Sequence, residues 1–379
     1  MFGERIRLGS AFGISINVDL SWVVGFVLIT WSLGGHYFPN RHPGWSASTY
    51  WGFALLTSVL FMSSVLLHEL AHSLVARRFG ISVHDITLFI FGGAAAIEHE
   101  PERPRDDLLI ALAGPVASLG LTGGFGVLWW FAPATGSPPL HALAGWLALI
   151  NLVMAVFNML PGLPLDGGRV LRAALWSITG SLTRATRFAS KTGQFLGLAL
   201  MLWGVWQAFT GNAVGGVWVA VVGWFLYGTA VESAAQAALE DLLAGHTARE
   251  IMMTDCPRVA RSRTLDIVVG EVVPTSNRGC FPVVEDDRYY GLLTLAQIKA
   301  VTRERWPFTR VIDVMRPRAE LPAVRPDEPL LTVLNQLSAT EAGQLPVLAN
   351  GRLVGMVTRE NVVDFILERS RIGDARSAS

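Results

Sequence analysis

The chain has few cysteines and few charged residues. Cysteine occurs only at positions 256 and 280, which gives no basis for a disulfide framework and indicates a reducing environment for this part of the chain. Charged residues make up 16% of the sequence and hydrophobic residues 51%, which is typical of a membrane protein with an appended soluble part. Lys plus Arg and Asp plus Glu both total 30, so net charge argues neither for nor against a nucleic-acid partner, and none is expected.

Residues 51–67 form a first uncharged stretch, without Asp, Glu, Lys or Arg, and residues 108–165 form a second. Hydropathy predicts six transmembrane helices of roughly 15 to 25 residues, the length that a bilayer requires. They lie at 17–35, 51–76, 107–132, 142–160, 192–210 and 213–232. The N-terminal residues lack the pattern of a cleavable signal peptide, so the first helix is expected to remain as a span.

Basic residues predict the orientation of these spans. Two arginines precede the first span, two follow the second, and a larger group follows the fourth. These residues are Arg5, Arg7, Arg77, Arg78, Arg169, Arg172, Arg184, Arg187 and Lys191. Because cytoplasmic loops of membrane proteins are enriched in Lys and Arg, we expect a multi-pass cell-membrane protein with both termini in the cytoplasm.

The motif His68-Glu69-Leu70-Ala71-His72 directly follows the first uncharged stretch. Histidines four residues apart project from one face of a helix, where both imidazoles can bind one Zn²⁺. Glu69 lies beside them and is placed to deprotonate a water molecule. Such a motif also arises by chance, but ionisable groups at the end of an apolar span are costly and usually functional.

A third zinc ligand is expected elsewhere in the chain, because a catalytic zinc keeps three protein ligands and one position for water. Asp166 is the first charged residue after the second uncharged stretch. Pro161 and Pro164 break the preceding helix, and a double glycine follows the aspartate. The alternative is a loop aspartate that caps the next helix, but the presence of the histidine motif favours a metal ligand.

With both motifs in place, the chain resembles the site-2 protease family of intramembrane zinc metalloproteases, in the subgroup with C-terminal CBS domains. The resemblance covers the whole chain and rests on the histidine motif and on Asn158-x-x-Pro161-x-x-Pro164-x-Asp166-Gly167. It implies one zinc ion bound by His68, His72 and Asp166, with Glu69 as the catalytic base. Asn158 matches a family asparagine that helps to position the substrate or the oxyanion.

Ala113-Gly114-Pro115 is similar to a small-residue motif of the same family. Many members continue that motif to an asparagine, whereas this chain has Ser118, so no polar role is predicted for Ser118. The remaining histidines His84, His99 and His141 are expected to be bystanders, because the three proposed ligands already complete the set.

Residues 81–97, between the second and third spans, are rich in β-branched and aromatic residues and turn at Gly92 and Gly93, which predicts a β-hairpin. A substrate helix hides its peptide carbonyls, so it must unwind before cleavage, and an edge strand near the zinc could hold the unwound segment. The site-2 protease family places a comparable element there. Gly92 and Gly93 are therefore candidate substrate or oxyanion contacts; the alternative is a re-entrant segment that only plugs the bundle.

After residue 232 the composition becomes charged and mixed, and an internal repeat appears with an offset of 63 or 64 residues. The matching segments are Arg249-Glu250-Ile251-Met252 with Ile312-Asp313-Val314-Met315, and Phe281-Pro282-Val283-Val284 with Leu345-Pro346-Val347-Leu348. Each copy predicts the order helix, strand, strand, helix and resembles a CBS domain. The expected domains are a membrane protease at 1–235, CBS 1 at 247–306 and CBS 2 at 307–370.

CBS pairs often bind adenine nucleotides such as ATP or AMP, and they often form homodimers. Their usual ribose-binding aspartate, three residues after a threonine, is replaced here: Gln297 follows Thr294, and Asn361 follows Thr358. Both side chains can still form a hydrogen bond with a hydroxyl group. A nucleotide-binding module and a purely structural or dimerising module both remain open.

The predicted fold class is an α-helical polytopic membrane domain, with a β-hairpin near the active site, followed by a soluble α/β CBS pair. The predicted function is a zinc metalloendopeptidase that lies in the bilayer and cleaves the transmembrane segment of a single-span, membrane-tethered regulatory protein. A transporter or channel with a CBS pair would share the spans but leave the zinc motifs as a coincidence. A non-catalytic relative is disfavoured by the intact Glu69.

Overall fold

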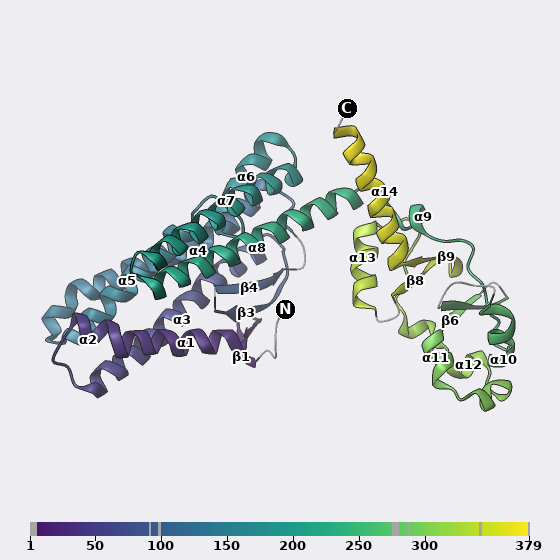
Figure 1. Ribbon diagram of the computed structural model, residues 1–379, viewed down its shortest axis with the longest axis horizontal. Coiled ribbons are helices and arrows are strands. Elements are labelled where there is room, and N and C mark those ends of the chain that lie inside the picture. Colours follow the sequence, from purple (N-terminus) through teal and green to yellow (C-terminus); the bar gives the residue numbers. More distant parts are fainter. Residues whose placement is uncertain are drawn as a thin grey trace. The chain divides into compact units, whose positions relative to one another are not determined.

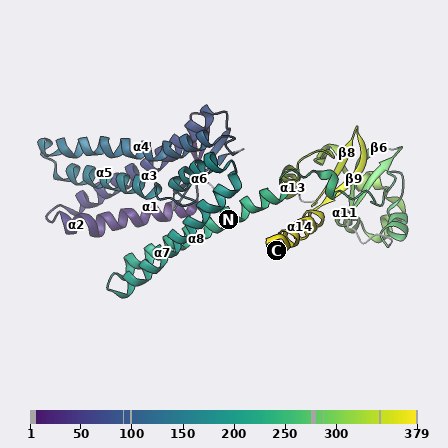
Figure 2. The same ribbon diagram turned by 90° about the horizontal axis from the view of Figure 1, so that it is seen from above.

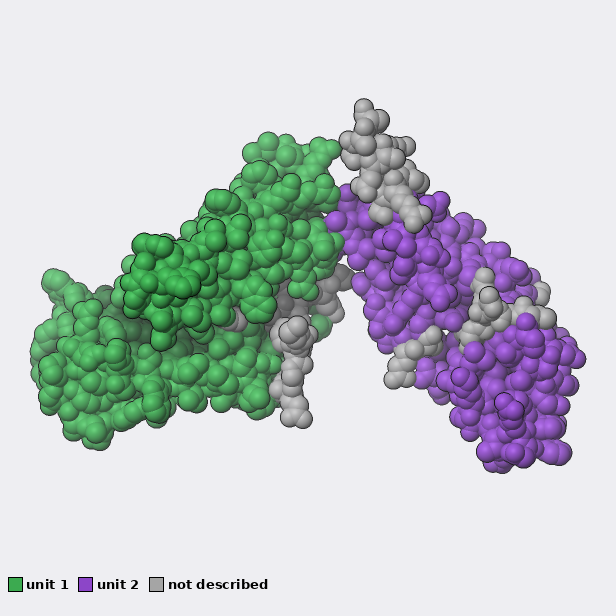
Figure 3. Space-filling model, in the orientation of Figure 1, with its two compact units in different colours: residues 1–237 green, residues 238–379 purple. Residues whose placement is uncertain are grey.

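The computed structural model describes residues 6–90, 92–97, 100–274, 280–286, 288–340 and 343–377 (Figure 1). The chain divides into two compact units, Met1–Ala237 and Ala238–Ser379 (Figure 3). The division lies close to the end of the membrane domain expected at residue 235, and each unit has its own hydrophobic core.

Helices dominate the first unit, and α3, α4 and α5 pack against one another (Figure 2). Its α-helices are α1 (Leu20–Ser32), α2 (Phe38–Arg41), α3 (Ala47–Arg78), α4 (Pro104–Phe131), α5 (Pro138–Asn158), α6 (Asp166–Thr179), α7 (Leu182–Phe209) and α8 (Ala213–Leu243), the last of which runs into the second unit. A π-helix (Leu33–Tyr37) follows α1, and a 3-10 helix (Ala132–Thr135) follows α4.

The ends of the longest helices follow from local sequence. The Ser46 side chain accepts a hydrogen bond from the Thr49 backbone at the start of α3, and Arg77 and Arg78 occupy its last turn, where cations favour the helix dipole. Proline stands in the first turn of both α4 and α5, where a missing N–H has no cost. A left-handed glycine, Gly180, ends α6.

Within the described residues, four helical segments are long and apolar enough to cross a membrane: Ala47–Arg78, Pro104–Thr135, Pro138–Asn158 and Ala213–Leu243. The other two predicted spans fall on α1, which has only 13 residues, and on α7, whose first half carries Arg184, Arg187 and Lys191. The count of six spans therefore stays a prediction. Large apolar side chains lie exposed on the long helices, among them Trp130, Trp224 and Val156, as expected of surfaces in contact with lipid.

The first unit also contains a four-stranded sheet in the order β1-β2-β3-β4. Its strands are β1 (Ile6–Ala11), β2 (Ile14–Val18), β3 (Val83–Phe89) and β4 (Gly92–Ile97). β2 runs parallel to β3, and the other neighbouring strands are antiparallel. For the first unit, the sequence predicted strands only in the segment 81–97, and the first span was expected to begin at residue 17, inside β2. The alternation of Ile14, Ile16 and Val18, all buried, was the available signal for β2.

The second unit contains two similar halves, each with the order helix, strand, strand, helix. The first half has α10 (Leu265–Ile267), a π-helix (Val268–Val272), β5 (Cys280–Glu285), β6 (Arg288–Thr294) and α11 (Leu295–Ala300). The second has α13 (Leu330–Ala339), β8 (Gln344–Ala349), β9 (Arg352–Thr358) and α14 (Arg359–Ser377). Shorter elements are α9 (Ala248–Ile251), α12 (Val311–Val314) and β7 (Arg316–Pro317), with 3-10 helices at Arg303–Phe308 and Arg318–Glu320.

An apolar cluster joins the two halves of this unit: Tyr289 and Leu292 of β6 pack with Leu348, Leu353 and Met356 of the second half. Because each half contributes residues to this cluster, the repeat forms one body in the structure, as a CBS pair would.

Candidate metal centre

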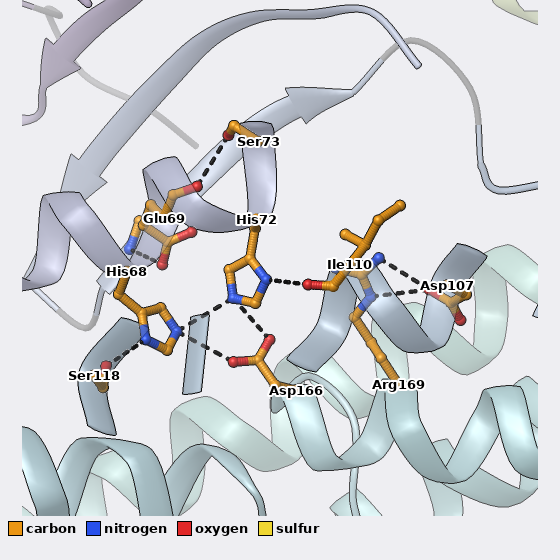
Figure 4. Close-up of polar contacts among 10 residues, drawn as sticks. His68, Glu69, His72, Ser73, Asp107, Ile110, Ser118, Asp166 and Arg169 are labelled. Atoms are coloured by element: carbon orange, nitrogen blue, oxygen red, sulfur yellow. Dashed lines mark hydrogen bonds and ion pairs between the residues drawn. The ribbon is translucent and has the colours of Figure 1, made fainter. Parts of the chain in front are cut away.

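Three side chains from two helices converge in the first unit (Figure 4). The Nε2 atoms of His68 and His72, both on α3, lie 3.2 Å from each other. Each also lies 3.2 Å from a carboxylate oxygen of Asp166, the first residue of α6. Two imidazole nitrogens and a carboxylate form a donor set typical of a catalytic zinc site, so these residues fit a metal ion.

Both histidine rings are oriented by contacts with α4. His72 Nδ1 lies 2.6 Å from the Ile110 carbonyl oxygen, and His68 Nδ1 lies 2.8 Å from Ser118 Oγ. A carbonyl can only accept a hydrogen bond, so Nδ1 of His72 carries the proton and Nε2 directs its lone pair at the centre. If the Ser118 oxygen likewise accepts from Nδ1, His68 adopts the same tautomer.

The prediction that Ser118 has no polar role is wrong. Ser118 is fully buried, and its hydroxyl contacts a proposed ligand from 50 residues further along the chain. The sequence signal was its place on α4, four residues after Gly114, which puts both residues on one helical face.

Gly114 provides the space into which the two rings project. A Cβ at this position would lie 2.2 Å from His72 Nε2 and 2.6 Å from His68 Nε2, far closer than atoms can approach. Glycine in the middle of a helix costs about 1 kcal/mol relative to alanine. The close approach of the rings to the α4 backbone explains why a glycine stands there.

Glu69 lies beside the cluster and contacts β4. The backbone N–H of Gly93 donates a hydrogen bond of 3.3 Å to Glu69 Oε1, and a Cβ on Gly93 would lie 2.5 Å from Glu69 Cγ. Gly92 has a φ of 145°, a backbone conformation that favours glycine. The structure therefore places Gly93 against the proposed base, with its amide engaged by the carboxylate.

The loop that leads to Asp166 is held by α7. The Leu163 backbone N–H donates a hydrogen bond of 3.0 Å to the Ala189 carbonyl, and a Cβ on Gly193 would lie 1.9 Å from the Leu163 carbonyl oxygen. The N-cap of α6 is Leu165, and Asp166 is the first helical residue. Asp166 is thus not the capping residue of the next helix, the alternative that the sequence left open.

The other sequence candidates of the first unit lie outside the cluster. Asn158 is half-buried at the end of α5 and, within the described chain, forms no hydrogen bond with the three converging residues. His84 is exposed, the His141 ring contacts the Trp129 carbonyl oxygen, and His99 lies outside the described residues.

The sequence analysis missed Asn151 of α5, which is fully buried. Its side-chain amide donates a hydrogen bond to Ser64 Oγ, one helical turn before His68 on α3.

In the second unit, the four candidate nucleotide contacts form two equivalent capping arrangements. Gln297 Oε1 accepts hydrogen bonds from the Thr294 backbone N–H at 2.8 Å and from its hydroxyl at 3.1 Å. Asn361 Oδ1 accepts from the corresponding groups of Thr358 at 3.1 and 2.9 Å. Each amide oxygen is therefore used to cap its own helix.

The sequence of this chain matches known families and proteins. The model of peptidase family M50 matches residues 56–134 and 132–203, which include all three converging residues and Glu69, and the CBS domain model matches residues 311–368. Rip3 of Mycobacterium tuberculosis, named as a candidate zinc metalloprotease, is 34% identical over 366 residues, covering 96% of this chain and 93% of Rip3. The similarly named sll0528 of Synechocystis is also 34% identical over 366 residues, 95% of each chain.

Solved structures are also similar to parts of this chain. The site-2 protease from Methanocaldococcus jannaschii is 28% identical, with a TM-score of 0.44 over 61% of this chain and 95% of that chain. The apolar helices, the converging histidine and aspartate side chains and the matches to family M50, Rip3 and sll0528 define a membrane metalloprotease. The chain belongs to peptidase family M50, the site-2 proteases, and carries a CBS pair.

Proposed function

We propose that the chain is a zinc endopeptidase that cleaves the transmembrane segment of a single-span, membrane-tethered regulatory protein. His68, His72 and Asp166 would hold one zinc ion, and Glu69 would act as the base. The observation that carries this proposal is the convergence of two Nε2 atoms and one carboxylate within 4.8 Å, with a second carboxylate adjacent.

Zinc, when bound, supplies a Lewis acid that acidifies water and polarises a peptide carbonyl. Glu69 takes a proton from the attacking water and returns it to the leaving amine. The Gly93 N–H holds the Glu69 carboxylate at this position, and the contacts of Ile110 and Ser118 hold the two imidazole rings with Nε2 facing the centre.

The position of β4 supports an unwound membrane segment as the substrate. β4 is the last strand of the sheet and pairs with β3 on one side, while Gly93 contacts Glu69. A substrate strand that pairs with the side of β4 that has no strand partner among the described residues would lie near the proposed base, and main-chain hydrogen bonds would replace those of its unwound helix. Asn158 and Gly92 remain candidate contacts for this segment.

Chelation tests this function directly. We expect the purified full chain to contain about one zinc ion, and cleavage of a reconstituted single-span substrate to fall to background when a strong chelator removes it. Re-addition of zinc should restore cleavage. Cleavage that persists in zinc-free protein would exclude the metalloprotease assignment of this site, whereas a transporter or channel would show neither zinc nor cleavage.

We also propose that both termini, the CBS pair and the active site face the cytoplasm. Arg77 and Arg78 follow the proposed ligands on α3, and a further basic group follows Asp166, so both motifs lie at basic ends of their spans. Tags at either terminus or near Gly180 should be protected in intact cells, and a tag at 43–46 should be accessible from outside. Labelling of a C-terminal tag in unpermeabilised cells would overturn this orientation.

We further propose that the CBS pair binds an adenine nucleotide at Thr294, Gln297, Thr358 and Asn361 and thereby regulates cleavage, with homodimer assembly as the alternative role. The amide oxygens already cap their helices, so each amide would offer its N–H groups, and we expect weak binding. Regulation also requires that the nucleotide bind two states of the protein with different affinity.

Calorimetry on the full chain with millimolar ATP or AMP measures this binding. We expect heat that is reduced several-fold in Thr294→Ala and Thr358→Ala, and a changed cleavage rate in the presence of the nucleotide. If wild type gives no heat and its rate is unchanged, the nucleotide role is excluded. A dimer that dissociates on removal of residues 247–379 would then favour the assembly role.

A further inference from the structure

A buried charge cluster ties α6 to α4 close to the metal centre. Asp107, in the first turn of α4, is fully buried. Arg169 donates to Asp107 Oδ1 from Nε at 3.2 Å and from Nη2 at 2.9 Å. Arg172 donates to both carboxylate oxygens at 2.9 Å, and its Nη1 lies 3.1 Å from Glu100 Oε1. Part of the cluster is visible in Figure 4.

The guanidinium group of Arg172 stays charged despite its burial. Arg172 is only 7% exposed, and burial alone would lower the pKa of its guanidinium group. Asp107 and Glu100 outweigh this effect and raise that pKa above its ordinary value. Buried ion pairs add little net stability compared with apolar packing, although removal of one partner is strongly destabilising. Stability alone is therefore a weak reason for a cluster with two arginines on one carboxylate.

The position of Asp107 on α4 suggests a more specific role. Ile110, Gly114 and Ser118 follow it at intervals of three, seven and eleven residues, which places all four on one helical face. Ile110 and Ser118 orient the two histidine rings, and Gly114 leaves room for them. Asp107 thus fastens α6 to the same face of α4 that sets the orientation of both histidines.

The arginines are equally well placed on α6. They follow Asp166 at intervals of three and six residues, along one side of the helix. Two guanidinium groups fixed on one carboxylate oppose both rotation of α6 about its axis and its displacement along α4. A rotation by one residue, about 100°, would carry the Asp166 carboxylate away from the histidines.

We propose that Asp107 is a positioning residue: with Arg169 and Arg172, it sets Asp166 against His68 and His72 and so assembles the metal centre. This inference rests on the proposed role of Asp166 as a ligand. None of the three positioning residues touches the metal or the substrate in this proposal, and their effect passes through the orientation of α6.

Asp107→Asn tests the inference, with Asp106→Asn as its matched control. Asp106 is the same residue type in the same helical turn but lies outside the charge cluster. Groups that orient metal ligands typically contribute about 10- to 100-fold to metal affinity. We expect zinc affinity of the full chain in detergent, measured by chelator competition, to fall by about this factor in Asp107→Asn and to stay at the wild-type value in Asp106→Asn.

The absorption spectrum of the cobalt(II)-substituted protein separates positioning from general stability. If the charge cluster positions Asp166, loss of the cluster should change how Asp166 binds cobalt and so alter the d–d bands of the folded variant. If the cluster only stabilises the fold, the variant should have a lower melting temperature and unchanged bands. Arg169→Gln serves as the milder variant, because it removes two hydrogen bonds and leaves Arg172 paired with Asp107. It decides the question if Asp107→Asn does not fold.

Two results would overturn the inference, and they differ from failure of the proposed function. The first is a folded Asp107→Asn or Arg169→Gln variant that binds zinc as tightly as wild type and has unchanged cobalt bands. This result would exclude the role of the charge cluster in positioning Asp166, whereas the protease assignment would stand. Wild type that binds no zinc removes the proposed function and this inference together.

Discussion

Glu69→Gln is expected to reduce cleavage of a single-span substrate by about 10²- to 10⁴-fold or more while the chain still binds one zinc ion. The glutamine has almost the same shape, and its amide oxygen can still accept the hydrogen bond that Gly93 donates at 3.3 Å. It cannot take a proton from water at neutral pH. The chemical step is therefore lost, whereas His68, His72 and Asp166 keep their positions.

Alanine substitutions of the three proposed ligands should give the opposite pattern. His68→Ala, His72→Ala and Asp166→Ala each remove one donor, so zinc content and cleavage should fall together. Metal analysis of the purified proteins and cleavage of a reconstituted substrate measure both quantities. Full zinc occupancy in Asp166→Ala would remove this residue from the ligand set, and substantial cleavage by Glu69→Gln would mean that another group acts as the base.

Gly114→Ala is expected to abolish zinc binding as completely as loss of a ligand. The added methyl group would lie 2.2 Å from His72 Nε2 and 2.6 Å from His68 Nε2, the two atoms that would bind the metal. The rings have no free direction of movement, because their Nδ1 atoms are held by Ile110 and Ser118. Either a histidine or the α4 backbone must shift, and the donor set is broken in both cases.

Gly120→Ala provides the matched control on the same helix. No atom lies within 4 Å of a Cβ at position 120, and alanine is favoured over glycine in helices by about 1 kcal/mol. We expect this variant to keep its zinc and activity with an equal or higher melting temperature. If Gly114→Ala also retained one zinc ion per chain, the two rings could not both face α4 as they do in this structure.

Several features were predictable from the sequence because they depend on local spacing. His68 and His72 share a face of α3 because a helix repeats every 3.6 residues, and the motif alone predicts this. Asp166 stood out because it is the first charged residue after the uncharged stretch 108–165 and is followed by two glycines. The repeat of residues 249–252 at 312–315 predicted two similar halves, which the second unit contains.

Other features were recognised only in part from the sequence. The arginines that follow Asp166 were interpreted only as markers of the cytoplasmic side, yet Arg169 and Arg172 bind Asp107 more than 60 residues away. The caps that Gln297 and Asn361 form are local, with threonines three residues earlier; they were missed because the two residues were compared only with the aspartate usual at their positions. The parallel pairing of β2 with β3 could not be predicted, because β3 follows only after α1, α2 and α3.

The sequence by itself determined the chemical components of the site: two histidines and a glutamate at one end of an apolar helix, and an aspartate after a segment broken by prolines. Such patterns are local and can be recognised without the fold. Only the tertiary structure decided how these components are held. The face of α4 that carries Asp107, Ile110, Gly114 and Ser118 acquires its role from α3 and α6 packing against it, because the orientation of a ring or a carboxylate depends on contacts between segments that folding brings together.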